Sequence, residues 1–248
     1  MEDAVILDNP VVDLVRACVE RSPLFAKNGG PLTAAFEEGD PESRVLIIAG
    51  DNASGKSFMV RLLAAKLNEK KIEPLQVSMK YRTTPGLHRA FMYGSGDAED
   101  STGNISLIAV RGALSTAEGR ATPNWVLLDE PDTGLAEGYC GALGIYLANF
   151  GNRMAASECE GMSVVTHSRR LVSSMLFSLH KKPHFLCFAD YVSDDLTQSW
   201  LEDERDRTVE ELLSLGEASI GKFRKINRIV EGARIIEGPR HPKGAASE

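Results

Sequence analysis

Eight consecutive residues have the types and spacing of a loop that binds phosphate. Gly50-Asp51-Asn52-Ala53-Ser54-Gly55-Lys56-Ser57 fits the pattern G-x-x-x-x-G-K-[ST]. The two glycines permit backbone angles that turn consecutive N–H groups toward an anion, at the positive end of a helix that begins near Lys56. In this chemistry Lys56 reaches the β- and γ-phosphates of a nucleotide, and the Ser57 hydroxyl binds Mg²⁺. The pattern predicts a nucleotide and Mg²⁺ as cofactors, with nucleotide contacts from Gly50, Asp51, Asn52, Ala53, Ser54, Gly55, Lys56, Ser57 and Phe58.

Two adjacent carboxylates follow an apolar run farther along the chain. Trp125-Val126-Leu127-Leu128 leads directly into Asp129 and Glu130. Asp129 is a candidate for holding the water shell of Mg²⁺, while Glu130 points to the other side and orients or deprotonates the attacking water. Two acids that merely cap a strand end are the alternative. Beside a phosphate loop, the metal and catalytic roles are the better interpretation.

A histidine follows a third apolar run. Ser163-Val164-Val165-Thr166 precedes His167, which becomes a candidate for contacting the γ-phosphate. A structural histidine at a strand end is the alternative. We therefore take Glu130, His167 and Lys56 as the candidate catalytic residues.

The elements that must position these residues alternate between strands and helices. Short runs of β-branched residues and leucine predict strands at 45–49, 74–79, 125–128, 163–166 and 184–189. Helical periodicity predicts helices at 58–70, 106–114, 139–156 and 169–180. This alternation predicts an α/β fold with a mainly parallel central sheet flanked by helices. We expect one domain over 1–237, with its core at about 45–190, a C-terminal helical addition at about 208–237 and a flexible tail at 238–248.

Composition narrows the class of protein further. The chain has 248 residues, of which 43% are hydrophobic and 25% are charged, so disordered and fibrous classes are excluded. Its apolar runs are far shorter than the ~20 residues of a membrane-spanning helix. The acidic start Met1-Glu2-Asp3-Ala4 and four scattered cysteines predict a cytoplasmic protein with buried thiols and no membrane partner. A net charge of -7 disfavours indiscriminate binding of nucleic acid, although the segment 219–248 is basic and is either a solvated helix face or a docking patch for an acidic partner.

The combination of phosphate loop, acidic pair and histidine resembles the ATP-binding-cassette (ABC) type of P-loop NTPase. The resemblance covers roughly 45–190 and includes the RecF- and SMC-like branch that acts on nucleic acids, together with related ATPases of phages and defence systems. It implies ATP hydrolysis and a homodimer, arranged head to tail around two Mg²⁺–ATP molecules.

Further residues receive roles only from this resemblance. Ser101 and Gly103 stand where the family has a signature that caps the γ-phosphate held by the opposite subunit, although Thr102 replaces the usual glycine and Asn104 the usual glutamine. Gln76 occupies the position of the family's glutamine that senses Mg²⁺ and the γ-phosphate. In the loop that contacts the other subunit, Ala136 occupies the position of the usual aspartate.

The spacing of the motifs favours a compact ATPase. The segment 57–100 between Lys56 and Ser101 is too short for the helical subdomain of a transporter motor or for long coiled-coil arms, so we expect a reduced helical subdomain. The expected function is an ATP-driven dimerisation switch in DNA repair, recombination or phage defence, with a protein effector encoded elsewhere and DNA as a possible ligand. A nucleotide switch that regulates a protein partner without DNA is the alternative. A small-molecule kinase is the third class, and the acidic pair with His167 fits hydrolysis better.

Overall fold

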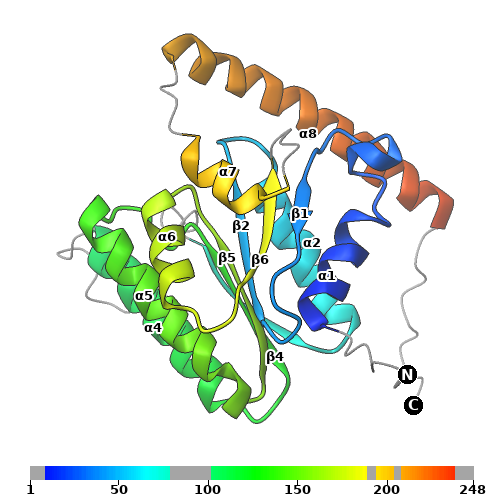
Figure 1. Cartoon of the computed structure of the whole chain (residues 1–248). Helices are drawn as coiled ribbons and strands as arrows, with labels where there is room; N and C mark the ends of the chain where they lie inside the picture. Colours follow the sequence, from blue (N-terminus) through cyan, green and yellow to red (C-terminus); the bar gives the residue numbers. More distant parts are fainter. Residues whose placement is uncertain (1–8, 79–101, 189–193, 204–207, 238–248) are drawn as a thin grey trace, which may run out of the picture.

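The protein is an α/β structure built on a six-stranded, mostly parallel sheet (Figure 1). The computed structural model describes residues 9–78, 102–188, 194–203 and 208–237. The strand order is β1-β6-β2-β5-β4-β3; β1 pairs antiparallel with β6, and the other neighbours are parallel. The strands are β1 (Ala35–Glu37), β2 (Val45–Gly50), β3 (Glu73–Ser78), β4 (Asn124–Asp129), β5 (Cys159–Val165) and β6 (His184–Phe188).

Helices cover both faces of the sheet. One hydrophobic cluster joins the sheet to α4, α5, α6 and α7, and a second joins it to α1, α2 and α8 (Figure 1). The helices are α1 (Pro10–Val19), α2 (Lys56–Glu69), α4 (Thr102–Gly119), α5 (Glu137–Arg153), α6 (Arg169–Ser178), α7 (Leu196–Glu202) and α8 (Val209–Glu237), with 3₁₀ turns η1 (Ala26–Asn28) and η3 (Met154–Ala156). In the described part of the chain, none of these helices is long and apolar enough to cross a membrane.

The central strands are apolar on both sides because both sides are covered. Every residue of β2 is buried; Val45 and Ile47 belong to the first cluster, and Leu46 and Ile48 to the second. This assignment follows from the alternation of side chains along a strand. A continuous apolar run is therefore the expected sequence for a parallel strand between two helical layers.

Five strands and four helices predicted from the sequence are present, with shifted ends. β5 begins at Cys159, earlier than expected, and α4 extends over Thr102–Gly119, well beyond 106–114. β1 and α1 were not predicted. Because β1 pairs with β6, the sheet begins before the expected core boundary at Val45. The expected tail at 238–248 lies outside the described residues.

The expected free thiols are confirmed. Cys18, Cys140, Cys159 and Cys187 are all buried and unpaired by disulfides. Burial raises the pKa of Cys18 and of Cys187 to about 12, which leaves these thiols protonated and unreactive near neutral pH.

The parallel register brings three strand ends together. Val165 of β5 pairs with Ile48 of β2 on one side and with Asp129 of β4 on the other. The segments that follow β2, β4 and β5 therefore leave the same edge of the sheet. Ligands of open parallel sheets bind outside this carboxyl edge.

Candidate functional site

The segment between β2 and α2 forms a tight glycine-dependent turn. Gly50 and Gly55 have φ angles of 140° and 120°, and Ala53 has a φ of 58°. A Cβ atom at Gly50 would lie 2.8 Å from the carbonyl oxygen of Phe188, and one at Gly55 would lie 2.8 Å from a methyl group of Leu32. Side chains at these two positions would therefore collide with the structure, and the turn leads without interruption into the amino terminus of α2. This is the geometry that an anion-binding loop requires.

Lys56 lies under the loop with its ammonium group surrounded by acceptors. It is buried, with 4% of the residue exposed, and donates to the carbonyl oxygens of Gly50 (2.7 Å) and Asp51 (2.6 Å). Its Nζ atom also lies 3.2 Å from Nδ1 of His167, a residue that follows β5. The lysine of the loop therefore contacts a side chain 111 positions away in the sequence.

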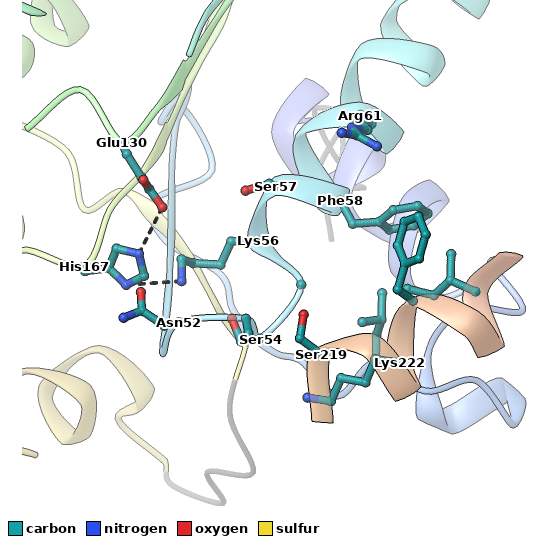
Figure 2. A pocket seen from close by; sticks show the side chains of 15 residues that line it. Asn52, Ser54, Lys56, Ser57, Phe58, Arg61, Glu130, His167, Ser219 and Lys222 are labelled. Atoms are coloured by element: carbon teal, nitrogen blue, oxygen red, sulfur yellow. Dashed lines mark hydrogen bonds and ion pairs between the residues drawn. The ribbon is translucent and has the colours of Figure 1, made fainter. Parts of the chain in front are cut away.

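His167 connects Lys56 with Glu130 (Figure 2). Its Nε2 atom lies 3.0 Å from Oε1 of Glu130, and Nδ1 lies 3.0 Å from the carbonyl oxygen of Gly50. A ring that carries its proton at Nε2 satisfies both side-chain contacts, since Lys56 then donates to Nδ1 and Nε2–H donates to the carboxylate, but it leaves Nδ1 with no proton for the carbonyl oxygen of Gly50. The side chains of His167 and Glu130 remain 34% and 26% exposed, so water and a ligand can reach them.

The backbone holds Glu130 in a strained conformation. Its φ angle is 56°, in the left-handed region that residues with a side chain rarely adopt. Its N–H donates to the carbonyl oxygen of Val165 (2.9 Å), and its own carbonyl accepts from the N–H of Thr133 (3.1 Å). Such strain costs about 1–3 kcal/mol and gathers at functional sites. The turn aims Glu130 at His167 instead of continuing β4.

Asp129 lies at the end of β4, buried beside Ser78. The two residues pair in the β3–β4 register, and the Ser78 hydroxyl donates to Oδ2 of Asp129 at 3.0 Å. Ser78 was not predicted from the sequence, although a hydroxyl residue near the end of the 74–79 run was a usable signal. Gln76 pairs with Leu127, two residues earlier, and lines a separate hollow against α4. The structure therefore places Ser78, and not Gln76, beside the aspartate.

A second polar contact ties the loop after Glu130 to the end of β5. The Thr166 hydroxyl donates to Oδ1 of Asp132 at 2.9 Å. Burial raises the pKa of Asp132, and the hydrogen bond from Thr166 opposes this shift. This contact fixes the segment that lies between the candidate catalytic residues and α5.

The start of α4 packs on the loop after Glu130 in the same chain. The Ser106 hydroxyl donates to the carbonyl oxygen of Thr133 at 2.8 Å. Gly103 is buried, and a Cβ atom there would lie 2.8 Å from Leu135 and 3.0 Å from the carbonyl oxygen of Gly134. The family resemblance implies that Gly103 contacts the nucleotide of the opposite subunit, but in the structure this glycine is covered by residues of its own chain. Ser101 lies outside the described residues.

A pocket of about 290 Å³ opens over the loop, near the lower end of the ~300–1,000 Å³ typical of small-molecule sites (Figure 2). Among the described residues, three cationic side chains and one carboxylate line it, so it favours an anionic ligand: Lys56, Arg61 and Lys222 against Glu130. The remaining lining comes from the loop, from α2, from His167 and Leu32, and from α8. The contribution of α8 was not foreseen, and its residues in the pocket are Ser219, Lys222, Phe223 and Ile226.

The donor types suit a magnesium ion shared with a phosphate. The described residues contain no cluster of three or more His, Cys, Asp or Glu that could hold a metal ion by itself. Mg²⁺ commonly takes one or two carboxylates and completes its shell with water and substrate phosphates. Ser57 lines the pocket and Asp129 ends β4, which β5 separates from β2, so the chain offers a hydroxyl and a carboxylate for this arrangement.

The fold and site define an α/β protein with a glycine-rich loop at the carboxyl edge of its sheet. No family model matches the sequence, and no curated protein matches it.

Proposed function

We propose that the protein is a P-loop ATPase that binds Mg²⁺–ATP over the 50–57 loop and hydrolyses it. The observation that carries this proposal is the chain of contacts from Lys56 through His167 to Glu130. These residues come from three separate segments, and each was a candidate from the sequence alone. The strand order adds support, because β5 lies between β2, which leads into the loop, and β4, which leads into the acids.

In this reaction Glu130 acts on water. Its carboxylate accepts a proton as the water oxygen bonds to the γ-phosphorus, and the bond from that phosphorus to the β–γ bridging oxygen breaks. The products are ADP and inorganic phosphate. His167 holds the carboxylate by a 3.0 Å contact, which orients Glu130 toward the pocket. Ser57 and Asp129 would hold Mg²⁺, which would neutralise the charge of the phosphates.

Lys56 and the loop bind the phosphates. The loop N–H groups and the amino terminus of α2 attract the anion, and phosphate oxygens replace the two carbonyl acceptors that Lys56 contacts in the structure. Burial strengthens this ion pairing, because few water molecules screen the ammonium group. The remaining cations of the pocket add to the attraction.

A single substitution separates catalysis from binding. Glu130→Gln removes the proton acceptor and keeps the shape of the side chain, so phosphate release falls by roughly 10²–10⁴-fold while ATP still binds. Phosphate release is measured beside calorimetric titration of ATP. Glu137→Gln is the matched control, since Glu137 is exposed at the start of α5.

Three results would overturn the proposal. These are wild-type protein that fails to release phosphate from ATP, Glu130→Gln protein with the wild-type rate, and Lys56→Met protein with unchanged ATP affinity. Product analysis with γ-labelled ATP separates hydrolysis from the kinase alternative. The label appears in inorganic phosphate for an ATPase and in an acceptor molecule for a kinase.

A further inference from the structure

We propose that α8 forms the base side of the nucleotide pocket, with Phe223 as the stacking platform for the base and Lys222 as a cation for the phosphates. The inference rests on the proposed function and extends it to a helix outside the phosphate-loop core. It starts from the lining of the pocket, in which α8 meets the 52–58 segment.

The residues at the two ends of the pocket indicate how the nucleotide is oriented in it. Glu130 and His167 lie on one side of Lys56, and Phe58 and Ser219 lie on the other (Figure 2). The γ-phosphate must lie at the end that holds Glu130, because water is activated there. The ribose and base therefore extend toward Phe58 and α8.

The spacing along α8 presents one face to this end of the pocket. Ser219, Lys222, Phe223 and Ile226 follow the i, i+3, i+4, i+7 pattern of a single helical stripe. Ile226 is buried in the second hydrophobic cluster, and Ile229 and Val230 pack against that cluster. The next turns of α8 thus anchor the helix, and the anchored helix carries Phe223 into the pocket.

The side chain of Phe223 is exposed, so a ligand in the pocket can contact its ring. Phe223 is 56% exposed, although Ile226, one turn farther along the helix, is buried. The face of an aromatic ring attracts any nucleobase, and such stacking is worth about 1–3 kcal/mol per base. A bound base would cover apolar surface that the folded chain leaves open.

Lys222 and Arg61 supply charge at the same end. Lys222 is half-buried on α8, and Figure 2 shows it with Ser219 on the side of the pocket that faces Ser54 of the loop. Arg61 is exposed on α2. Among the described residues that line the pocket, Glu130 at the opposite end carries the negative charge. Lys222, which lies beside Ser54 of the loop, therefore attracts phosphate oxygens without a competing carboxylate in the lining beside it (Figure 2).

The test compares ATP with tripolyphosphate, which carries the phosphates without ribose or base. Phe223→Ala should weaken ATP binding roughly 5- to 150-fold and leave tripolyphosphate binding unchanged, whereas Phe223→Trp should keep ATP affinity near wild type. Ile220→Ala is the matched control, because Ile220 is 55% exposed on the same helix and lies outside the pocket lining. Binding is measured by calorimetry, with thermal unfolding to compare the stability of the variants.

Lys222→Ala should weaken both ligands, with Lys225→Ala as an exposed control outside the pocket lining. Wild-type ATP affinity in Phe223→Ala protein would overturn the inference, as would equal weakening of ATP and tripolyphosphate by that change. Unchanged tripolyphosphate binding in Lys222→Ala protein would overturn the role of Lys222. If wild-type protein binds tripolyphosphate as tightly as ATP, the base platform is wrong but the phosphate loop stands. If wild-type protein binds neither, the proposed function itself fails.

Discussion

At the scale of single residues, the hydrogen bond from Ser78 to Asp129 gives the site a positioning group. The Ser78 hydroxyl donates to Oδ2 of Asp129 at 3.0 Å, and both residues are buried. This hydrogen bond fixes the orientation of the carboxylate and therefore the position of Oδ1. Ser78→Ala removes this restraint without adding bulk. We expect the Mg²⁺ concentration for half-maximal ATP hydrolysis to rise roughly 10- to 100-fold, the range typical of partners that orient metal ligands.

The matched variants for this prediction are Ser78→Thr and Ser115→Ala. Threonine keeps the hydroxyl and suits a strand, so it should restore the wild-type Mg²⁺ requirement. Ser115 is exposed on α4 and tests the effect of removing a hydroxyl elsewhere. A Ser78→Ala protein with lower thermal stability but an unchanged Mg²⁺ requirement would reduce Ser78 to a structural role.

The sequence was sufficient to identify Lys56, His167 and Glu130 as candidate catalytic residues, because each stands in or directly after a short, recognisable segment. It was insufficient for Ser78, whose role depends on the β3–β4 register. The same register explains the position of Gln76, which a family pattern placed at the site. A shift of two residues along a strand keeps a side chain on the same face and moves it about 7 Å away from the strand end.

At the scale of elements, the strands were predictable wherever both faces are buried, since such strands read as apolar runs. β1 was not, because its three residues are only half-buried and carry no strong pattern. The helix α8 was predicted, but its contribution to the pocket was not. Phe223 is exposed in the pocket, whereas Ile226, one turn farther along the helix, is buried in the core.

His184, the first residue of β6, makes the stability of this element depend on pH. The residue is fully buried, its Nδ1 accepts from the N–H of Gly39 (3.0 Å), and its Nε2–H donates to the carbonyl oxygen of Ser43 (3.2 Å). Burial lowers its pKa below 6.5, and the charges of Glu38 and Asp40 oppose this shift. The folded chain therefore binds fewer protons than the unfolded chain just below pH 6.5.

We expect the free energy of unfolding to be highest above pH 6.5 and to fall as the pH drops toward the lowered pKa of His184. One proton bound only by the unfolded chain gives a slope of at most about 1.4 kcal/mol per pH unit. Urea unfolding at pH 8, 7, 6 and 5 measures this slope. His184→Gln should be less stable at pH 8 but should show a flatter dependence, whereas His180→Gln, at an exposed position, should follow wild type. Equal slopes in wild-type and His184→Gln protein would contradict this account.

At the scale of the whole molecule, one pocket brings together segments from most of the chain. Leu32, the loop, α2, the ends of β4 and β5, and α8 all contribute to its lining. A ligand that contacts these segments stabilises the folded state as a unit, by about 2.7 kcal/mol at a concentration of 100 Kd. In the proposed function, ATP is this ligand.

Two copies of the chain are expected to form a dimer when ATP is bound. His167 and Glu130 remain partly exposed, and the family resemblance implies that another subunit covers this site when ATP is bound. Because ADP lacks the γ-phosphate, only ATP would bridge the two subunits and favour the closed pair. Glu130→Gln protein, which keeps ATP intact, should therefore sediment as a dimer with ATP and as a monomer with ADP.

Lys56→Met protein is the control for this experiment, and it should remain monomeric with ATP because the phosphates lose their ammonium partner. The burial of Gly103 against Leu135 means that any contact with the partner's nucleotide must come from groups other than that glycine. Glu130→Gln protein that binds ATP in a titration yet sediments as a monomer would restrict the reaction to groups of a single chain.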